Sequence, residues 1–134
     1  RPTRIICTGM TYPTLLPRTL GVDWTITIDP VDPSEPPTGW TSMTVDLRSG
    51  PTEDFDLLAT SRTIAGPLSQ TIDTTGSDPD AAEIRLVVEA SATAAIPPPG
   101  CKGEEGFTFL QVRFGTVEAL PVIRIPVVDN LAAL

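Results

Sequence analysis

The chain of 134 residues contains no histidine and only one lysine. Without histidine it has no imidazole for a Ser-His-Asp or Cys-His relay, none to ligate a metal, and no side chain that ordinarily titrates near neutral pH. The lysine, Lys102, stands in a loop rich in glycine and proline. A solvated loop does not supply the desolvation that a catalytic amine needs. We therefore expect no enzymatic activity, no catalytic residues and no cofactor.

Cysteine and long apolar runs are also scarce. Cys7 and Cys101 are far apart and belong to no Cys-x-x-Cys spacing, so a redox or metal motif has no support. They could form a disulfide or stay as free thiols, and the redox compartment decides which form persists. The start of the chain has a basic end but no continuous apolar region behind it, so we expect no secretory leader. No apolar run approaches the roughly 20 residues of a membrane helix, so we expect no membrane partner.

The charge is predominantly negative, with 17 acidic against 9 basic side chains and a net charge of -8. Nucleic acid and anionic lipid would both be repelled, so neither is expected as a partner. All basic residues except Lys102 are arginines. They could make bidentate contacts with carboxylates of a partner, which arginine does better than lysine, or they could reflect a GC-rich genome. With 40% hydrophobic and 19% charged residues, the composition is typical of a single folded domain.

Three groups of acidic residues are candidate cation sites: Asp29 with Asp32 and Glu35, Glu53 with Asp54 and Asp56, and Asp78 with Asp80 and Glu83. None matches the calcium loop of twelve residues with its central glycine and terminal glutamate. We interpret them as solvated loop acids and predict no metal site. If one group did bind Ca²⁺, Asp78-Pro79-Asp80 would be the best placed.

Alternation of apolar and polar residues is the dominant pattern, and it predicts β-strands. It is clearest from Val22 to Ile28, where Trp24 and Ile26 share a face, and from Ile84 to Ala90. The predicted strands cover residues 22–28, 43–48, 55–59, 68–72, 84–90, 107–112 and 117–128. Pro121 and Pro126 cannot donate to a ladder, so the last strand should lie at an edge or carry a bulge.

Two further segments depart from this pattern. Residues 91–96 predict one helical turn, with Ser91 as its N-cap, before three consecutive prolines. Residues 1–20 have three prolines and no helical period, so we predict an extended arm that docks on its own domain or on a neighbouring subunit.

The fold class expected from these elements is all-β, a single antiparallel β-sandwich of about seven strands with one short helical turn. Its organisation would be an extended N-terminal arm (1–20), a sandwich domain (21–129) and a C-terminal tail (130–134). We expect Trp40 to close the edge of the sandwich as a large apolar plug.

Three runs of residues carry a resemblance to a known family. They are Thr19 to Ile28, Thr38-Gly39-Trp40-Thr41 with the strand that follows to Arg48, and Ile84 to Val88 with the continuation Ala90 to Pro97. Over residues 18–129 the chain resembles the small immunoglobulin-like β-sandwich proteins of tailed bacteriophage particles, which serve as head decoration proteins or as tail and baseplate modules. The resemblance implies an Ig-like sandwich and a structural role, and it supplies no catalytic residues.

Unpaired edge strands and a stiff, proline-rich arm favour docking on another subunit. We therefore expect a capsid decoration or cement protein that bridges capsid subunits within the virion, assembled in the cytoplasm of the host bacterium. Its partners would be other virion proteins, first the major capsid protein, and copies of itself. The predicted contact residues in the arm are Arg4, Tyr12, Leu15, Leu16 and Arg18. One alternative is a tail or baseplate component, and another is a carbohydrate-binding module that stacks sugars on Trp24, Trp40 or Tyr12.

Overall fold

Nine β-strands and one short α-helix make up the part of the chain that the computed structural model describes, which is residues 12–28, 39–66, 69–96, 106–115 and 118–128. In chain order they are β1 (Arg18–Thr19), β2 (Trp24–Ile28), β3 (Met43–Arg48), β4 (Leu57–Thr60), β5 (Ile72–Asp73), β6 (Ile84–Val88), α2 (Ala90–Ala94), β7 (Gly106–Phe114), β8 (Glu118–Ala119) and β9 (Ile123–Val128). Among these residues no helix is long and apolar enough to cross a membrane.

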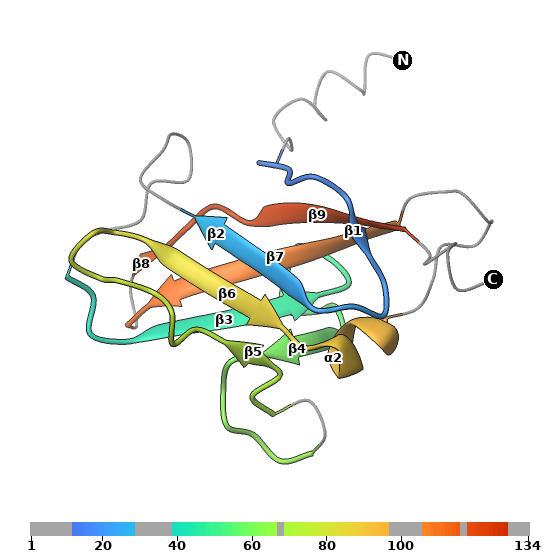
Figure 1. The fold of residues 1–134 in the computed structure, drawn as a ribbon, viewed down its shortest axis with the longest axis horizontal. Helices are drawn as coiled ribbons and strands as arrows, with labels where there is room; N and C mark the ends of the chain where they lie inside the picture. The colour runs from blue at the N-terminus through green and yellow to red at the C-terminus, as the bar shows by residue number, and fades with distance from the viewer. Residues whose placement is uncertain (1–11, 29–38, 67–68, 97–105, 116–117, 129–134) are drawn as a thin grey trace.

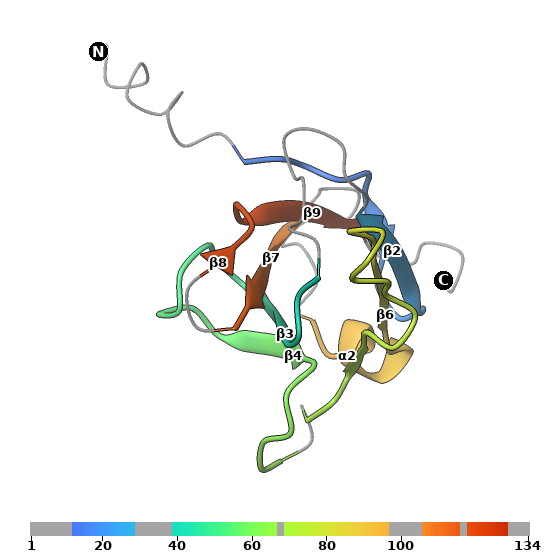
Figure 2. The ribbon, with the colours of Figure 1, turned by 90° about the vertical axis from the view of Figure 1, so that its left-hand side faces the viewer.

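The strands form two sheets that face each other (Figures 1 and 2). The larger sheet has the order β1-β9-β7-β3-β4, with β8 paired to β7, and the smaller sheet has the order β2-β6-β5. Neighbouring strands are antiparallel except for β1 and β9. The order β2-β6-β5 opposite β4-β3-β7-β9 is that of a variable-type immunoglobulin sandwich. The predicted all-β, Ig-like sandwich is confirmed.

The core lies between the sheets and follows the predicted alternation. Trp24, Ile26 and Ile28 of β2 are buried, while Thr25 and Thr27 between them are exposed. Strands β3, β6, β7 and β9 contribute further large aliphatic side chains, including Leu47, Leu86, Leu110 and Ile125, which have no exposed surface. Many immunoglobulin domains have a disulfide across this core, but β2 and β7 contain no cysteine. Cys7 and Cys101 lie outside the described residues, so the structure does not test the two alternatives of a disulfide and free thiols.

The described part of the predicted arm, residues 12–20, is extended and lies along β9. Arg124 N donates to Pro13 O at 2.7 Å, Leu15 N donates to Arg124 O at 2.9 Å, and Leu20 N donates to Val128 O at 3.0 Å. Strand β1 pairs in parallel with Val127 and Val128. Residues 12–20 of the arm therefore dock on their own domain, which is one of the two predicted alternatives.

Two side chains tie this segment to the smaller sheet as well. The indole N–H of buried Trp24 donates to Thr19 O at 2.8 Å, and Arg18 Nη1 donates to Thr25 O at 3.0 Å. Strand β1 belongs to the larger sheet and β2 to the smaller one. These bonds therefore link the two layers at the edge where the chain passes from one to the other.

Helix α2 begins earlier than the sequence predicts. Its N-cap is Glu89 rather than Ser91, and no side chain of its own caps it. The carboxylate of Asp23, distant in sequence, accepts a hydrogen bond from Ala90 N at 2.7 Å. A tertiary contact thus replaces the local cap that the sequence pattern favoured.

Several strand boundaries also differ from the prediction. Val22 and Phe55 are exposed and precede their strands. The strand predicted over 68–72 is reduced to the two residues of β5, because the positive φ of Gln70 interrupts the extended backbone. Leu68 lies outside the described residues. The segment predicted as one strand over 117–128 is divided into β8 and β9. Short paired segments of two residues are too brief for alternation to reveal them.

Pro126 stands inside β9, next to the edge of the larger sheet. Arg124 exchanges both backbone bonds with the arm, so Pro126, two residues further on, also turns its nitrogen toward the arm and away from β7. The missing N–H therefore falls on the side of the arm and leaves the β7 ladder intact. The prediction that this strand lies at an edge or carries a bulge is wrong, because β1 lies outside β9 and the pairing of β9 with β7 has no shift of register.

The side chain of Thr93 provides a test of how α2 is held. Thr93 is completely buried, and its hydroxyl donates to Val22 O at 2.7 Å and accepts from Gly21 N at 3.1 Å. Thr93→Val keeps the shape but leaves these backbone groups unsatisfied, so we expect a loss of about 1–3 kcal/mol in the free energy of unfolding, measured in urea. Thr93→Ser keeps the hydroxyl and should lose only about 1 kcal/mol for the missing methyl group. A valine variant as stable as the native protein would contradict this account.

Candidate functional site

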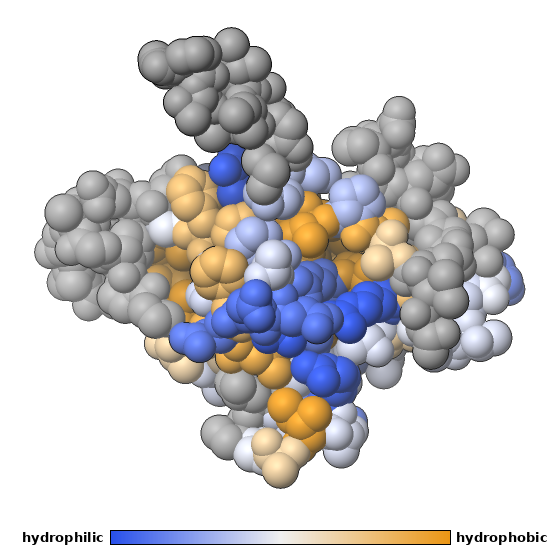
Figure 3. All heavy atoms as spheres, turned by 180° about the vertical axis from the view of Figure 1, so that it is seen from behind, coloured by the Kyte–Doolittle hydropathy of each residue, from blue (hydrophilic) through white to orange (hydrophobic). Residues whose placement is uncertain are grey.

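The outer face of the larger sheet carries the side chains that the core does not use. In β7, Thr108, Leu110 and Val112 are buried, so Phe107, Phe109, Gln111 and Arg113 lie on the opposite face. This outer face therefore has an aromatic end, near the arm, and a charged end. Figure 3 shows a hydrophilic band across this side of the molecule with hydrophobic surface beside it.

At the aromatic end, the arm, β7 and β9 meet. The ring of Tyr12 packs edge-on against Phe109 with centroids 5.5 Å apart. The guanidinium carbon of Arg124 lies 4.7 Å from the ring centroid of Phe107, in a cation–π arrangement. Phe107 nevertheless keeps 45% of its surface exposed, and Leu16 keeps 80%. We call Tyr12, Leu16, Phe107 and Phe109 the aromatic patch.

The contact residues predicted in the arm have different environments. Tyr12 is half-buried on Phe109, and Leu15 is half-buried against the core. Arg18 is half-buried and bonded to Thr25 O, whereas Leu16 faces solvent. Arg4 lies outside the described residues. Leu16 therefore has the largest free surface among the four that are described, and its role in binding stays a prediction.

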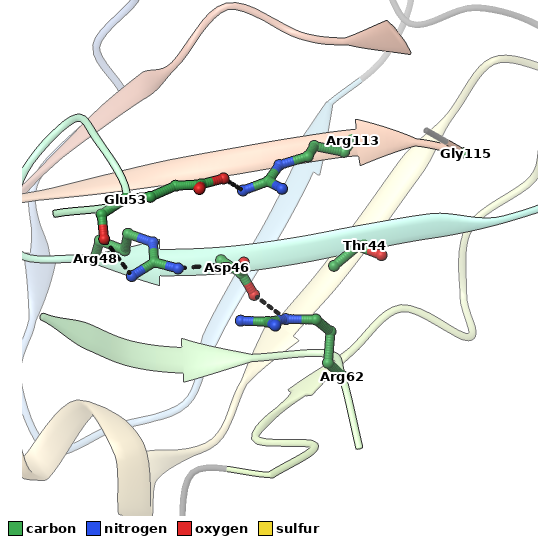
Figure 4. A pocket seen from close by; sticks show the side chains of 7 residues that line it. All are labelled: Thr44, Asp46, Arg48, Glu53, Arg62, Arg113 and Gly115. Atoms are coloured by element: carbon green, nitrogen blue, oxygen red, sulfur yellow. Dashed lines mark hydrogen bonds and ion pairs between the residues drawn. The ribbon is translucent and has the colours of Figure 1, made fainter. Parts of the chain in front are cut away.

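At the charged end lies a hollow of about 260 Å³ (Figure 4). Strands β3 and β7 and the segments beside them supply its lining, which consists of Thr44, Asp46, Arg48, Glu53, Arg62, Arg113 and Gly115. We call it the arginine hollow. It contains three guanidinium groups and two carboxylates, so it is locally positive on a chain whose net charge is -8.

Asp46 is the anchor of the arginine hollow. Its residue is only 3% exposed, and its Oδ1 accepts hydrogen bonds from the Thr60 hydroxyl at 2.6 Å and from Arg62 Nε at 3.1 Å. Arg48 Nη2 lies 3.9 Å from its other oxygen. A buried carboxylate is stable only when it is paired and hydrogen-bonded, and here both conditions are met.

The loop between β3 and β4 closes one side of the hollow. Arg48 Nη1 donates to the backbone oxygens of Glu53 and Phe55, and the Phe55 ring lies so close to Gly50 that no side chain could stand there. From this loop the Glu53 carboxylate reaches across to pair with Arg113 Nη2 on β7. Figure 4 shows these side chains pointing toward one another across the strands.

The arginine hollow is not evident from the sequence. The alternation over 43–48 placed Thr44, Asp46 and Arg48 together on the polar face of a strand. Arg62 and Arg113 are brought to this face by the pairing of β3 with β4 and with β7. The sequence does not show which strands pair, so it did not indicate that these two arginines lie beside Asp46.

A second hollow, of about 380 Å³, lies at the β5 side of the smaller sheet and is lined by Ser61, Gln70, Ile72, Asp73, Thr74, Thr75 and Glu89. Asp73 accepts hydrogen bonds from the backbone N–H of Thr75 at 2.9 Å and from its hydroxyl at 2.8 Å. Both bonds lower the pKa of Asp73 below its usual value, and the bond from the Thr75 backbone N–H has the larger effect. These contacts form a local turn, and they satisfy the carboxylate.

The candidate cation groups show no metal-binding arrangement in the described residues. No set of three or more histidine, cysteine, aspartate or glutamate side chains there is placed to hold a metal ion. Asp78 accepts a bond from Asp80 N at 3.1 Å and bridges to Glu83 in a turn, while Asp29, Asp32 and Glu35 lie outside the described residues.

The aromatic residues considered for sugar stacking are mostly engaged elsewhere. Trp24 is 1% exposed and cannot stack a sugar, so that part of the carbohydrate hypothesis is wrong. Trp40 is half-buried against the core, with its ring centroid 5.0 Å from that of Phe114, where the plug interpretation places it.

Comparison with known proteins adds no family. No protein-family model and no curated protein sequence matches the chain. Among solved structures, the NK cell receptor NKp44, described as a triggering partner in natural cytotoxicity, matches with a TM-score of 0.47 and 14% identity over 90% of this chain and 99% of that one. A match at this level indicates nothing about function.

Asp46→Asn tests whether the anchor of the arginine hollow is electrostatic. The variant keeps the shape but leaves Arg48, whose side chain is 13% exposed, without a counter-charge. We expect the free energy of unfolding to fall by about 3 kcal/mol, as for other broken buried pairs, measured by urea denaturation. The exposed Asp56→Asn is the matched control and should stay within about 0.5 kcal/mol of the native protein. Equal stability of the two variants would contradict the pairing.

Thr75→Ala tests the cause of the lowered pKa of Asp73. The variant loses the hydroxyl donor and keeps the backbone N–H, so the pKa should rise without reaching the usual aspartate value, as followed by carboxyl-carbon NMR. Because the folded-state pKa is lowered, the ionised carboxylate favours the fold above the unfolded-state pKa, and this contribution is lost as the pH falls through the folded-state pKa. The native protein should therefore lose more stability on acidification than Thr75→Ala, and Thr74→Ala should behave as the native protein does.

Proposed function

We propose that the chain is a non-enzymatic structural protein of a tailed-phage virion that binds neighbouring subunits through the aromatic patch. The observation that carries this proposal is Leu16, a leucine with 80% of its surface in solvent that is held between two fixed points. On one side Leu15 N is bonded to Arg124 O, and on the other Arg18 pairs with Val127. A side chain presented in this way loses little conformational freedom when a partner covers it.

The neighbours of Leu16 extend the same surface. The two pairing points place Leu16 beside the middle of β9, and Pro126 there is opposite Phe107 of β7, which is itself 45% exposed. A single exposed leucine needs no explanation, but adjacent exposed apolar side chains on a rigid sheet are typical of a contact site. The aromatic patch supports binding to a protein surface rather than to a small molecule, because its residues are spread over the arm and strand β7 and line neither of the two hollows.

The resemblance to phage sandwich proteins supports the biological setting. We infer a capsid decoration or cement protein that stabilises neighbouring capsid subunits, with the major capsid protein and copies of itself as partners, in a virion assembled in the bacterial cytoplasm. A tail or baseplate component is the alternative and would use the same patch. A carbohydrate-binding module is less supported, since Trp24 is buried and Tyr12 packs on Phe109.

Leu16→Ser tests the proposal without disturbing the fold, because Leu16 buries almost nothing in its own domain. We expect binding of the purified protein to capsids or tails to weaken at least tenfold, since burying a leucine contributes about 1.5–3 kcal/mol. The urea midpoint should not change. Val22→Ser, at another aliphatic position that is 41% exposed, is the matched control and should bind as the native protein does.

Native binding by Leu16→Ser would overturn the patch as the contact site. Deletion of residues 1–17 is a less selective test, because it also removes the hydrogen bonds of Pro13 and Leu15 to Arg124. Binding of the native protein to capsids but not to tails, lost in Leu16→Ser, would separate the decoration hypothesis from the tail alternative.

A further inference from the structure

The arginine hollow contains donor groups that the protein itself does not use. Arg62 engages Asp46 and Thr60 through Nε alone, so within the described residues its two Nη groups have no partner. Arg113 uses Nη2 for Glu53 and Gln111, and its Nε and Nη1 are unpartnered within that same part of the chain. Both side chains are about 40% exposed, at 40% and 41%. Two accessible guanidinium groups therefore line the same space with several donors free.

The Glu53 carboxylate is the one occupant of this space that can leave at little cost. Its side chain is 65% exposed, and its partner Arg113 is 41% exposed. Ion pairs in solvent contribute about 0.2–1 kcal/mol, so an incoming anion can replace Glu53 without a large penalty. Asp46, by contrast, is buried and bonded to two donors, so it stays in place when Glu53 leaves.

The charges of the lining favour an anion as the replacement, and the pairing geometry of arginine favours a carboxylate. With Glu53 displaced, three guanidinium groups face the single carboxylate of Asp46. The volume of about 260 Å³ exceeds the roughly 30 Å³ of one water several times, which is enough for a side-chain carboxylate. Arginine pairs with carboxylates in a fixed planar geometry, and the anions already present in the hollow are both carboxylates.

We propose that the arginine hollow binds a glutamate or aspartate side chain from an acidic segment of a protein partner, and that Glu53 is its internal stand-in. The partner's carboxylate pairs with Arg113 and Arg62, and the loop that carries Glu53 gives way. This site goes beyond the aromatic patch, and it also applies if the partner is not a virion protein.

The test follows the N–H signals of the arginine Nε groups by NMR while a blocked hexaglutamate peptide is added to the full chain. Arg62 and Arg113 should shift and Arg85, which is on the smaller sheet, should not. Glu53→Gln removes the stand-in and should bind the peptide about two- to fivefold more tightly, the fold-change that corresponds to a surface ion pair. Arg113→Gln should weaken binding by a similar factor or more, and the matched control Arg85→Gln should bind as the native protein does.

Glu53→Gln that binds the peptide no more tightly than the native chain would overturn the proposal. If the Glu53–Arg113 ion pair were purely structural, its removal would not increase the affinity for the peptide. Inorganic phosphate that shifts Arg62 and Arg113 at the same concentration as the peptide would also overturn it, in favour of a free-anion site. No particle enters this experiment, and Leu16→Ser should bind the peptide normally. Its failure is therefore distinguishable from failure of the proposed function.

Discussion

The register of β3 against β7 is the constraint on which both faces of the larger sheet depend. It pairs Val45 with Val112 and Leu47 with Leu110, which places four aliphatic side chains in the core. The side chains that alternate with them, including those of Asp46 and Arg113, therefore lie on the outer face of the larger sheet. A slip by one residue would bury the charged set and expose the aliphatic one, so the core selects the geometry of the arginine hollow. The surface chemistry is in this sense a consequence of core packing.

A second constraint joins the beginning of the described chain to its end. The segment before β2 pairs along β9 and is bonded to β2 through Arg18 and Trp24. It covers an edge that would otherwise expose a row of backbone groups, which natural sheets avoid. The same pairing fixes Leu16 in place while leaving its side chain in solvent. The covering of this edge and the presentation of the aromatic patch are therefore two effects of one arrangement.

The aromatic patch and the arginine hollow lie on a continuous face, because β7 runs through both. Its outward residues change from Phe107 and Phe109 to Gln111 and Arg113 within one strand. An apolar end gives affinity through burial, and a charged end gives selectivity through paired geometry. The preference of this chain for arginine over lysine, for which the sequence offered two explanations, has a structural use at this site. Arg48 donates to the backbone of the loop at Phe55, Arg62 donates to Asp46, and Arg113 pairs with Glu53.

The sandwich could be predicted from the sequence alone, since alternation of apolar and polar residues over 24–28 and 43–48, and nearly so over 84–88, gives each strand an apolar face that must be buried against another sheet. The sequence also showed that Trp40 would pack at the edge of the core. It could not give the cap of α2, the two-residue strands or the arginine hollow. Asp23 reaches Ala90 across 67 residues of sequence, and Glu53 reaches Arg113 across 60. Periodicity reports which face of a strand is apolar, whereas only the pairing of strands in three dimensions decides which polar side chains meet on the other face.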